Sequence, residues 1–184
     1  MRRVVSALVL LPLVMLVSCA GGFKMVKQES RVEPTADPEK ATLVIMRTTM
    51  YGFAVVMNSY VDGKYIGQTK GKCYFTTKVD PGEHWLIGAC ENRAVAKVTF
   101  EAGKMYYFEQ LVIIGVMKAR TGWEPRDQAY FSQQLPELTY ITPEPGFVGE
   151  DMEADDLQED MDNFEKEVVK DPERHRNTLE YKGF

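Results

Sequence analysis

The chain has 184 residues, a formal net charge of −5 and 45% hydrophobic residues, an ordinary composition for a globular protein. This length allows one domain with short appendages, and the lack of a basic stripe argues against a nucleic-acid partner. The negative charge is concentrated at the end of the chain. Residues 150–184 hold 13 acidic and 5 basic residues, whereas residues 19–149 hold 14 acidic and 15 basic residues.

The first residues have the parts of a secretory signal. Arg2 and Arg3 give a positive start, and residues 4–17 are apolar except for Ser6 and Pro12. This run is shorter than the roughly 18 to 20 residues that a membrane-spanning helix needs. We therefore predict a secretory signal helix in these residues. The alternatives are an uncleaved membrane helix and an ordinary secretory signal in which the cysteine at position 19 has no role.

The segment Leu16-Val17-Ser18-Cys19 closes this run and resembles the lipobox of bacterial lipoproteins. The resemblance implies that the signal peptide covers residues 1–18 and is cut before Cys19. It also implies that Cys19 carries a diacylglycerol thioether and an acylated amino group. Two or more acyl chains give stable attachment to a membrane. In lipoproteins of enteric-type bacteria, an aspartate directly after the cysteine favours retention in the inner membrane. Ala20 stands at this position, so we expect the protein in the outer membrane of a bacterial cell envelope, facing the periplasm.

Residues 19–40 are polar, contain Pro34 and Pro38, and show no periodicity. This pattern predicts a flexible tether. About twenty flexible residues span roughly 25 Å, which is enough to lift a domain clear of the lipid headgroups without fixing its orientation.

Residues 41–114 have the pattern of β-strands. Gly-rich turns separate the runs and no helix lies between them, which favours a single antiparallel β-sandwich over a βαβ fold. Asp62-Gly63 predicts a hairpin, because a type I′ turn needs positive φ at both central residues. The predicted strands cover residues 42–46, 53–61, 73–79, 83–90, 94–100 and 105–114.

Residues 115–149 are less regular. Pro125 is tolerated at a first helical position, so a short helix is expected from Pro125 to Gln134. Residues 138–141 have the pattern of an edge strand. The prolines at 143 and 145 mark the end of a sandwich domain assigned to residues 41–148.

Residues 149–184 form an acidic tail that we predict to be helical or disordered. Leu157, Met161, Phe164 and Val168 recur at helical spacing on one narrow stripe. Three interpretations remain open: a solvated helix that packs its stripe on the sandwich, a largely disordered segment, or a helix that docks on a partner through the stripe. Glu173 to Phe184 is predicted to be a disordered end.

Two motifs carry a family resemblance. Val61-Asp62-Gly63-Lys64-Tyr65-Ile66-Gly67-Gln68-Thr69 and Asp80-Pro81-Gly82-Glu83-His84 resemble the "V-D-G-K-x-x-G-x-T" and "P-G-x-H" patterns of PEGA-type β-sandwich modules. The chain is most similar to a related, uncharacterised lipoprotein family with a domain of unknown function. The resemblance covers about residues 40–114. It implies a small Ig-like sandwich with an envelope-associated binding or spacer role, and no catalytic residue.

The second motif also predicts a strand register. If Asp80 pairs with Glu83 across the turn, Cys73 faces Cys90 at a non-hydrogen-bonded position. The Cα atoms of such a pair are roughly 4.5 to 5.5 Å apart, which a disulfide accepts. We therefore predict a structural disulfide between Cys73 and Cys90, with two buried free thiols as the alternative.

We find no catalytic motif, metal-ligand pattern or cofactor loop in the sequence. His84 and His175 are the only histidines, and His84 is expected to pack or to form a hydrogen bond. A sugar-stacking face that uses Tyr106, Tyr107 and Phe108 is an alternative to their role in the core. The expected function is a non-enzymatic envelope lipoprotein with a structural or protein-binding role. The alternative is a ligand- or glycan-binding lipoprotein that uses the sandwich surface.

Overall fold

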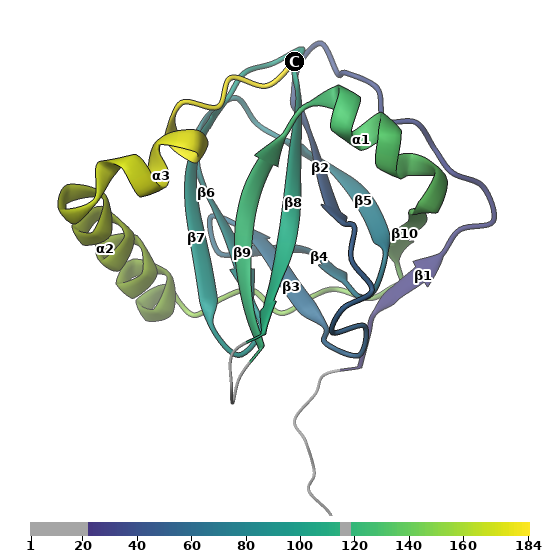
Figure 1. Cartoon of the computed structure of the whole chain (residues 1–184), viewed down its shortest axis with the longest axis horizontal. Helices are drawn as coiled ribbons and strands as arrows, with labels where there is room; N and C mark the ends of the chain where they lie inside the picture. Colours follow the sequence, from purple (N-terminus) through teal and green to yellow (C-terminus); the bar gives the residue numbers. More distant parts are fainter. Residues whose placement is uncertain (1–21, 115–118) are drawn as a thin grey trace, which may run out of the picture.

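The computed structural model describes residues 22–114 and 119–184 (Figure 1). The predicted signal peptide 1–18 and the predicted lipidation site Cys19 lie outside the described residues. The strands are β1 (Met25–Lys27), β2 (Ala41–Arg47), β3 (Met57–Val61), β4 (Lys64–Thr69), β5 (Cys73–Val79), β6 (Gly82–Ala89), β7 (Arg93–Phe100), β8 (Met105–Ile114), β9 (Ala119–Arg126) and β10 (Thr139–Pro143). The helices are α1 (Gln128–Gln134), α2 (Ala154–Lys170) and α3 (Pro172–Leu179). In this described part, no helix is both long enough and apolar enough to cross a bilayer.

The strands form two sheets, so the prediction of a mainly β fold is confirmed. One sheet has the order β1-β10-β5-β2-β8-β9 and the other has the order β4-β3-β6-β7. The prediction of an all-antiparallel sandwich is wrong, because β2 runs parallel to β8 and β10 runs parallel to β5. All four strands of the second sheet lie between β2 and β8 in the sequence. The chain then returns to the first sheet, where β8 runs in the same direction as β2.

The main core lies between the two sheets. Alternate residues of β2, including Leu43 and Ile45, meet Leu86, Val98 and Phe100 of the other sheet. The remaining residues of β2 point to the outer face, where Val44 and Met46 pack under α1. All seven residues of β2 are buried as a result. This explains why its sequence is apolar without alternation.

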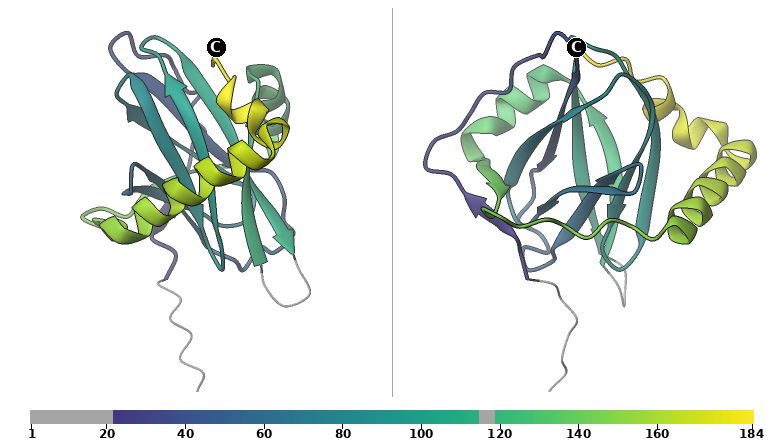
Figure 2. Two further views of the ribbon diagram at one scale, coloured as in Figure 1. Left: turned by 90° about the vertical axis from the view of Figure 1, so that its left-hand side faces the viewer. Right: turned by 180° about the vertical axis from the view of Figure 1, so that it is seen from behind.

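The helices cover the outer faces of both sheets. Phe131 of α1 packs on Tyr74 and Tyr107 of the six-stranded sheet. On the opposite side of the molecule, α2 crosses the outer face of the four-stranded sheet, and α3 follows it (Figure 2). The acidic segment is thus part of the fold.

The hairpin at Asp62-Gly63 is confirmed. Asp62 has φ 51° and Gly63 has φ 76°, and Val61 pairs with Lys64 across the turn. The strand predicted before this hairpin is shorter than expected, because β3 begins only at Met57. The guanidinium of the fully buried Arg47 fixes the preceding loop by donating hydrogen bonds to the carbonyl groups of Tyr51, Gly52 and Val55.

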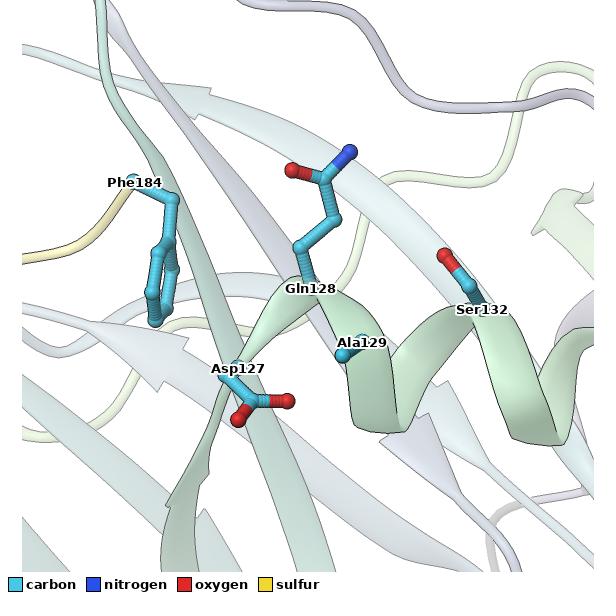
Figure 3. A pocket seen from close by; sticks show the side chains of 5 residues that line it. All are labelled: Asp127, Gln128, Ala129, Ser132 and Phe184. Carbon is cyan, nitrogen blue, oxygen red and sulfur yellow. The ribbon is translucent and has the colours of Figure 1, made fainter.

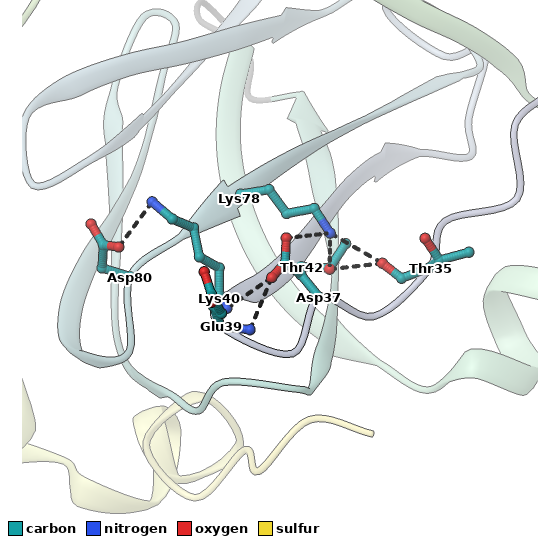
Figure 4. Close-up of polar contacts among 7 residues, drawn as sticks. All are labelled: Thr35, Asp37, Glu39, Lys40, Thr42, Lys78 and Asp80. Carbon is teal, nitrogen blue, oxygen red and sulfur yellow. Dashed lines mark hydrogen bonds and ion pairs between the residues drawn. The ribbon is translucent and has the colours of Figure 1, made fainter.

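The turn at residues 80–82 does not close a hairpin. The chain passes there from β5 in one sheet to β6 in the other. Proline and a glycine at φ 141° do not match the primed turns that join paired strands. An ion pair of 3.0 Å between Lys40 and Asp80 lies at this corner (Figure 4).

The predicted tether is wrong from Met25 onward. β1 pairs with β10, and further along Arg31 donates a 3.0 Å hydrogen bond to the carbonyl of Leu138. The backbone of Val32 exchanges hydrogen bonds with the Tyr74 hydroxyl. Asp37 accepts backbone hydrogen bonds from Glu39 and Lys40, and these contacts lower its pKa (Figure 4). The proline-containing segment therefore runs along the domain surface.

The predicted helix start at Pro125 is also displaced. Pro125 lies in β9, an edge strand, where a residue without an N–H is tolerated. The helix α1 begins after Asp127, whose carboxylate accepts a 2.6 Å hydrogen bond from the Tyr130 N–H. The sequence pattern predicts an edge strand for β10, but β10 lies between β1 and β5.

The predicted disordered end is ordered. Asp171-Pro172 begins α3, since the Asp171 carboxylate accepts a hydrogen bond from the Arg174 N–H. The Tyr181 hydroxyl donates a 2.5 Å hydrogen bond to the carbonyl of Arg126. The backbone of Phe184 exchanges two hydrogen bonds with Met105. The last residues of the chain are therefore hydrogen-bonded to β8 and β9 of the six-stranded sheet.

Candidate ligand-binding groove

A groove of about 570 Å³ lies where α2 and α3 meet β7 and β9. Ligand pockets commonly fall between about 300 and 1,000 Å³. The apolar part of its lining includes Val95, Leu111, Trp123 and Phe164. The polar part includes Arg93, Arg120, Asp160, Asn163, Glu167, Arg174 and His175.

The predicted helical stripe holds one wall of this groove in place. Leu157, Met161, Phe164 and Val168 pack with Trp85 and neighbouring residues on the outer face of the four-stranded sheet. The rings of Phe164 and Trp85 meet edge to face, with centroids 5.5 Å apart. The docking prediction for this stripe is therefore corrected, because its partner is the chain's own sheet.

Ion pairs between Arg93 and acidic residues of α2 connect β7 to this helix. Its Nε is 2.6 Å from one carboxylate oxygen of Asp160, and its other nitrogens face Asp156 and Glu159 at 3.4 and 3.7 Å. The hydrogen bond to Asp160 raises the pKa of Arg93. Burial raises the pKa of Asp160, although Arg93 opposes the shift. This ion-pair network fixes α2 over the start of β7.

Hydrogen bonds of Asn92, in the β6–β7 turn, and of Trp123 fix β9 at the other wall of the groove. The Asn92 amide accepts a 2.6 Å hydrogen bond from the Thr121 N–H and donates to the Thr121 carbonyl at 3.3 Å. Trp123 Nε1 donates a 3.1 Å hydrogen bond to the carbonyl of Ala94. A Cβ at Gly88 would lie 3.0 Å from the Trp123 ring, so glycine there allows the indole to pack closely.

The groove combines hydrogen-bonding groups with aromatic surface. Arg120 is exposed and has no ion-pair partner among the described residues, whereas Arg174 lies 3.6 Å from Glu167. His175 packs against Phe164 with ring centroids 4.8 Å apart, and its Nε2 is 3.6 Å from Glu167. Arg120 and Asn163 are therefore the exposed polar side chains best placed to contact a ligand. Sequence reasoning missed both, because the groove joins residues about forty positions apart.

A second hollow lies at the start of α1. It has a volume of about 480 Å³ and is lined by Asp127, Gln128, Ala129, Ser132 and Phe184 (Figure 3). The Asp127 carboxylate already caps the helix. Because fewer side chains line this hollow, the groove at α2 and α3 is the better candidate.

The predicted disulfide residues do not face each other across a ladder. Cys73 is in β5 and Cys90 follows β6, and these strands lie in different sheets. Both residues are free thiols. Burial raises the pKa of Cys73 to about 11, which keeps this thiol protonated at neutral pH. The prediction of a hairpin register between them is thus wrong.

His84 has the hydrogen-bonding role that the sequence predicts. Its Nδ1 is 2.6 Å from an Asp62 carboxylate oxygen, and the other oxygen accepts from the Trp85 N–H at 2.9 Å. Its ring also packs on Phe100. Tyr106, Tyr107 and Phe108 are all buried, so the proposed sugar-stacking face is wrong for these three residues.

A buried carboxylate in β8 forms another polar cluster. Glu109 is 5% exposed and accepts hydrogen bonds from Arg126 at 2.8 Å, from the Tyr130 hydroxyl at 3.0 Å, and from Thr48. This cluster joins β9, α1 and the residue that follows β2 to the central strand β8. In the sequence, Glu109 and Gln110 stand out as the polar pair within an otherwise largely apolar strand. Within the described residues, no group of three or more His, Cys, Asp or Glu side chains is arranged to hold a metal ion.

The chain has a distant bacterial relative. It is 28% identical over 94 residues to an uncharacterized protein of Haemophilus influenzae. The match covers 50% of this chain and 56% of the relative, so it spans only about half the length of each. No protein-family model matches the chain. No solved structure matches it either.

Proposed function

We propose that this protein is a lipid-anchored lipoprotein of the bacterial cell envelope that binds a ligand in the groove without catalysing a reaction. The lipobox-like segment that ends at Cys19 supports the anchor, and the expected location is the periplasmic face of the outer membrane. The similarity to a Haemophilus influenzae protein supports a bacterial origin. The groove between α2, α3, β7 and β9 carries the binding part of the proposal.

The lining of the groove favours a glycan or another small polar ligand. Trp123 offers an aromatic ring, and Arg120 and Asn163 offer hydrogen-bond donors to hydroxyl or carboxylate groups. Aromatic side chains together with a few polar groups are typical of small-molecule sites. The helical stripe cannot serve as the docking surface for a protein, since it is packed on the four-stranded sheet.

The surroundings of the histidines support a non-catalytic role. His84 is held between Asp62 and Phe100, and His175 packs edge-on against Phe164. A general base needs a reacting group within hydrogen-bonding reach. Both rings are instead engaged in contacts that stabilise the fold.

Titration of the full-length, detergent-solubilised protein with peptidoglycan fragments and envelope oligosaccharides tests the binding proposal. Arg120→Ala and Asn163→Ala should each weaken binding, Arg120→Ala by about ten-fold to a hundred-fold. A hydrogen bond to a charged group contributes about 1.5 to 3 kcal/mol. Arg176→Ala is the matched control, since Arg176 pairs with Glu173 and does not line the groove. Equal affinities for all variants, or conversion of the ligand to a product, would contradict the proposal.

A further inference from the structure

The loop between β2 and β3 exposes three large apolar side chains in succession. Met50 is 54% exposed, Tyr51 is 62% exposed and Phe53 is 63% exposed. The loop backbone is anchored to β2, because the Arg47 guanidinium donates hydrogen bonds to the carbonyls of residues 51, 52 and 55. Its backbone is therefore held by the domain while its side chains point into solvent.

This loop lies beside the first described residues. The Sδ atom of Met50 is 3.5 Å from the position that a Cβ would take at Gly71. The neighbouring Lys70 places its ammonium 5.9 Å from the centroid of the Phe23 ring. Figures 1 and 2 show the β2–β3 loop and the start of the described chain at one end of the molecule, with the C-terminus at the opposite end.

We propose that the β2–β3 loop rests on the lipid bilayer and orients the domain, an inference that depends on the proposed lipid anchor at Cys19. Only residues 20–22 separate Cys19 from Phe23, and four residue steps span at most about 14 Å. A lipid on Cys19 therefore keeps this end of the domain near the membrane surface. The long flexible tether that would have lifted it away is instead packed on the domain as β1 and the segment after it.

The chemistry of this end fits the interfacial region of a bilayer. Aromatic residues are enriched at membrane–water interfaces, where an apolar ring meets the lipid headgroups. Tyr51 and Phe53 offer such rings. Lys70 is exposed and has no ion-pair partner among the described residues, so its ammonium is available to lipid phosphate. Apolar side chains and a cation side by side favour an anionic lipid surface over a purely apolar or purely charged partner.

Fluorescence quenching by lipid tests this orientation. The full-length lipidated protein is reconstituted into vesicles of phosphatidylethanolamine and phosphatidylglycerol with brominated acyl chains. Phe53→Trp places an indole in the loop, and Phe184→Trp is the matched control at the opposite end, where the side chain is 52% exposed. The wild-type protein, with Trp85 and Trp123, gives the baseline. We expect the added fluorescence to be quenched for Phe53→Trp and unaffected for Phe184→Trp.

The mass of the same samples separates the two proposals. A protein with lipid on Cys19 whose Phe53→Trp and Phe184→Trp variants are quenched equally, or not at all, would overturn the orientation and leave the anchor intact. If the variants oligomerise and the Phe53→Trp fluorescence is then no longer quenched, the loop mediates contacts between copies of the chain. This result would also overturn the proposed orientation. A Cys19 without lipid would overturn both proposals.

Discussion

At the scale of single residues, glycines decide how closely the layers approach. A Cβ at Gly67 would lie 2.8 Å from the ring of Phe75, which belongs to the other sheet. A Cβ at Gly63 would lie 3.1 Å from Leu157 of α2. The two glycines of the first motif thus make room for the core and for the helix as well as for the turn.

Replacement of Gly67 tests this packing. Gly67→Ala should lower the free energy of unfolding by about 1 to 3 kcal/mol, because overpacking forces neighbouring groups to move. Urea denaturation measures the change. Gly22→Ala is the control, since nothing lies within 4 Å of a Cβ at that position. Equal stability of the two variants would show that Phe75 gives way without cost.

The sequence predicts local backbone geometry better than buried charge. Asp62-Gly63 determines its own turn through positive φ, and the prediction there is confirmed. Arg47 and Glu109 are almost fully buried, although charged residues usually lie at the surface. Their partners are loop carbonyls, Arg126 and Tyr130, which come together only in the folded chain.

At the scale of elements, the acidic helix acts as a cover for the four-stranded sheet. The periodicity of Leu157, Met161, Phe164 and Val168 predicts the helix and its apolar face. Periodicity does not tell which surface the apolar face meets, so the sequence alone does not distinguish packing on the sandwich from docking on a partner. Asp171 follows the last residue of α2, and the same residue caps the start of α3, which begins at Pro172. Helix stop and start signals share these residue types.

Truncation of Phe164 measures how much this cover stabilises the fold. Phe164 is 4% exposed and contacts both Trp85 and His175. Phe164→Ala should therefore destabilise the protein by about 3 to 5 kcal/mol. Val169→Ala, on the exposed side of α2 at 84% exposure, should change stability by less than about 0.5 kcal/mol. If the two variants unfold at the same denaturant concentration, α2 does not pack as described.

At the scale of the whole molecule, the order of strands decides which residues meet. Hairpin reasoning assigned β5 and β6 to one ladder and paired Cys73 with Cys90. The crossover at residues 80–82 sends the strands to different sheets. Sequence patterns predict strands and turns, but a crossover between sheets depends on how the whole chain packs. The groove was missed for the same reason, since it forms only after α2 and α3 close against β7 and β9.

Buried tyrosines make the fold sensitive to alkaline pH. Burial raises the pKa of Tyr107 to about 12 and raises the pKa of Tyr65 and Tyr181 further. The unfolded value is about 10. The contribution of these neutral hydroxyls to the free energy of unfolding is fully present below pH 10. It is lost as the pH rises through the folded pKa values.

Ultraviolet titration of tyrosinate, followed together with circular dichroism, measures this effect. The buried tyrosines should ionise only above pH 10, in step with loss of the β signal. Tyr181→Phe should lose its hydrogen bonds to Tyr107 and Arg126 and should remove one of the late-ionising groups. Ionisation of all nine tyrosines near pH 10 with the fold intact would contradict the described core.

The proposed lipid anchor at Cys19 is the basis of the proposed location and of the proposed orientation of the domain. Intact-mass spectrometry of the protein extracted from the cell envelope tests it most directly. We predict a chain that lacks residues 1–18, begins at Cys19 and carries the added mass of a diacylglycerol and an amide-linked acyl group. A chain that begins at Met1, or an unmodified Cys19, would contradict the account.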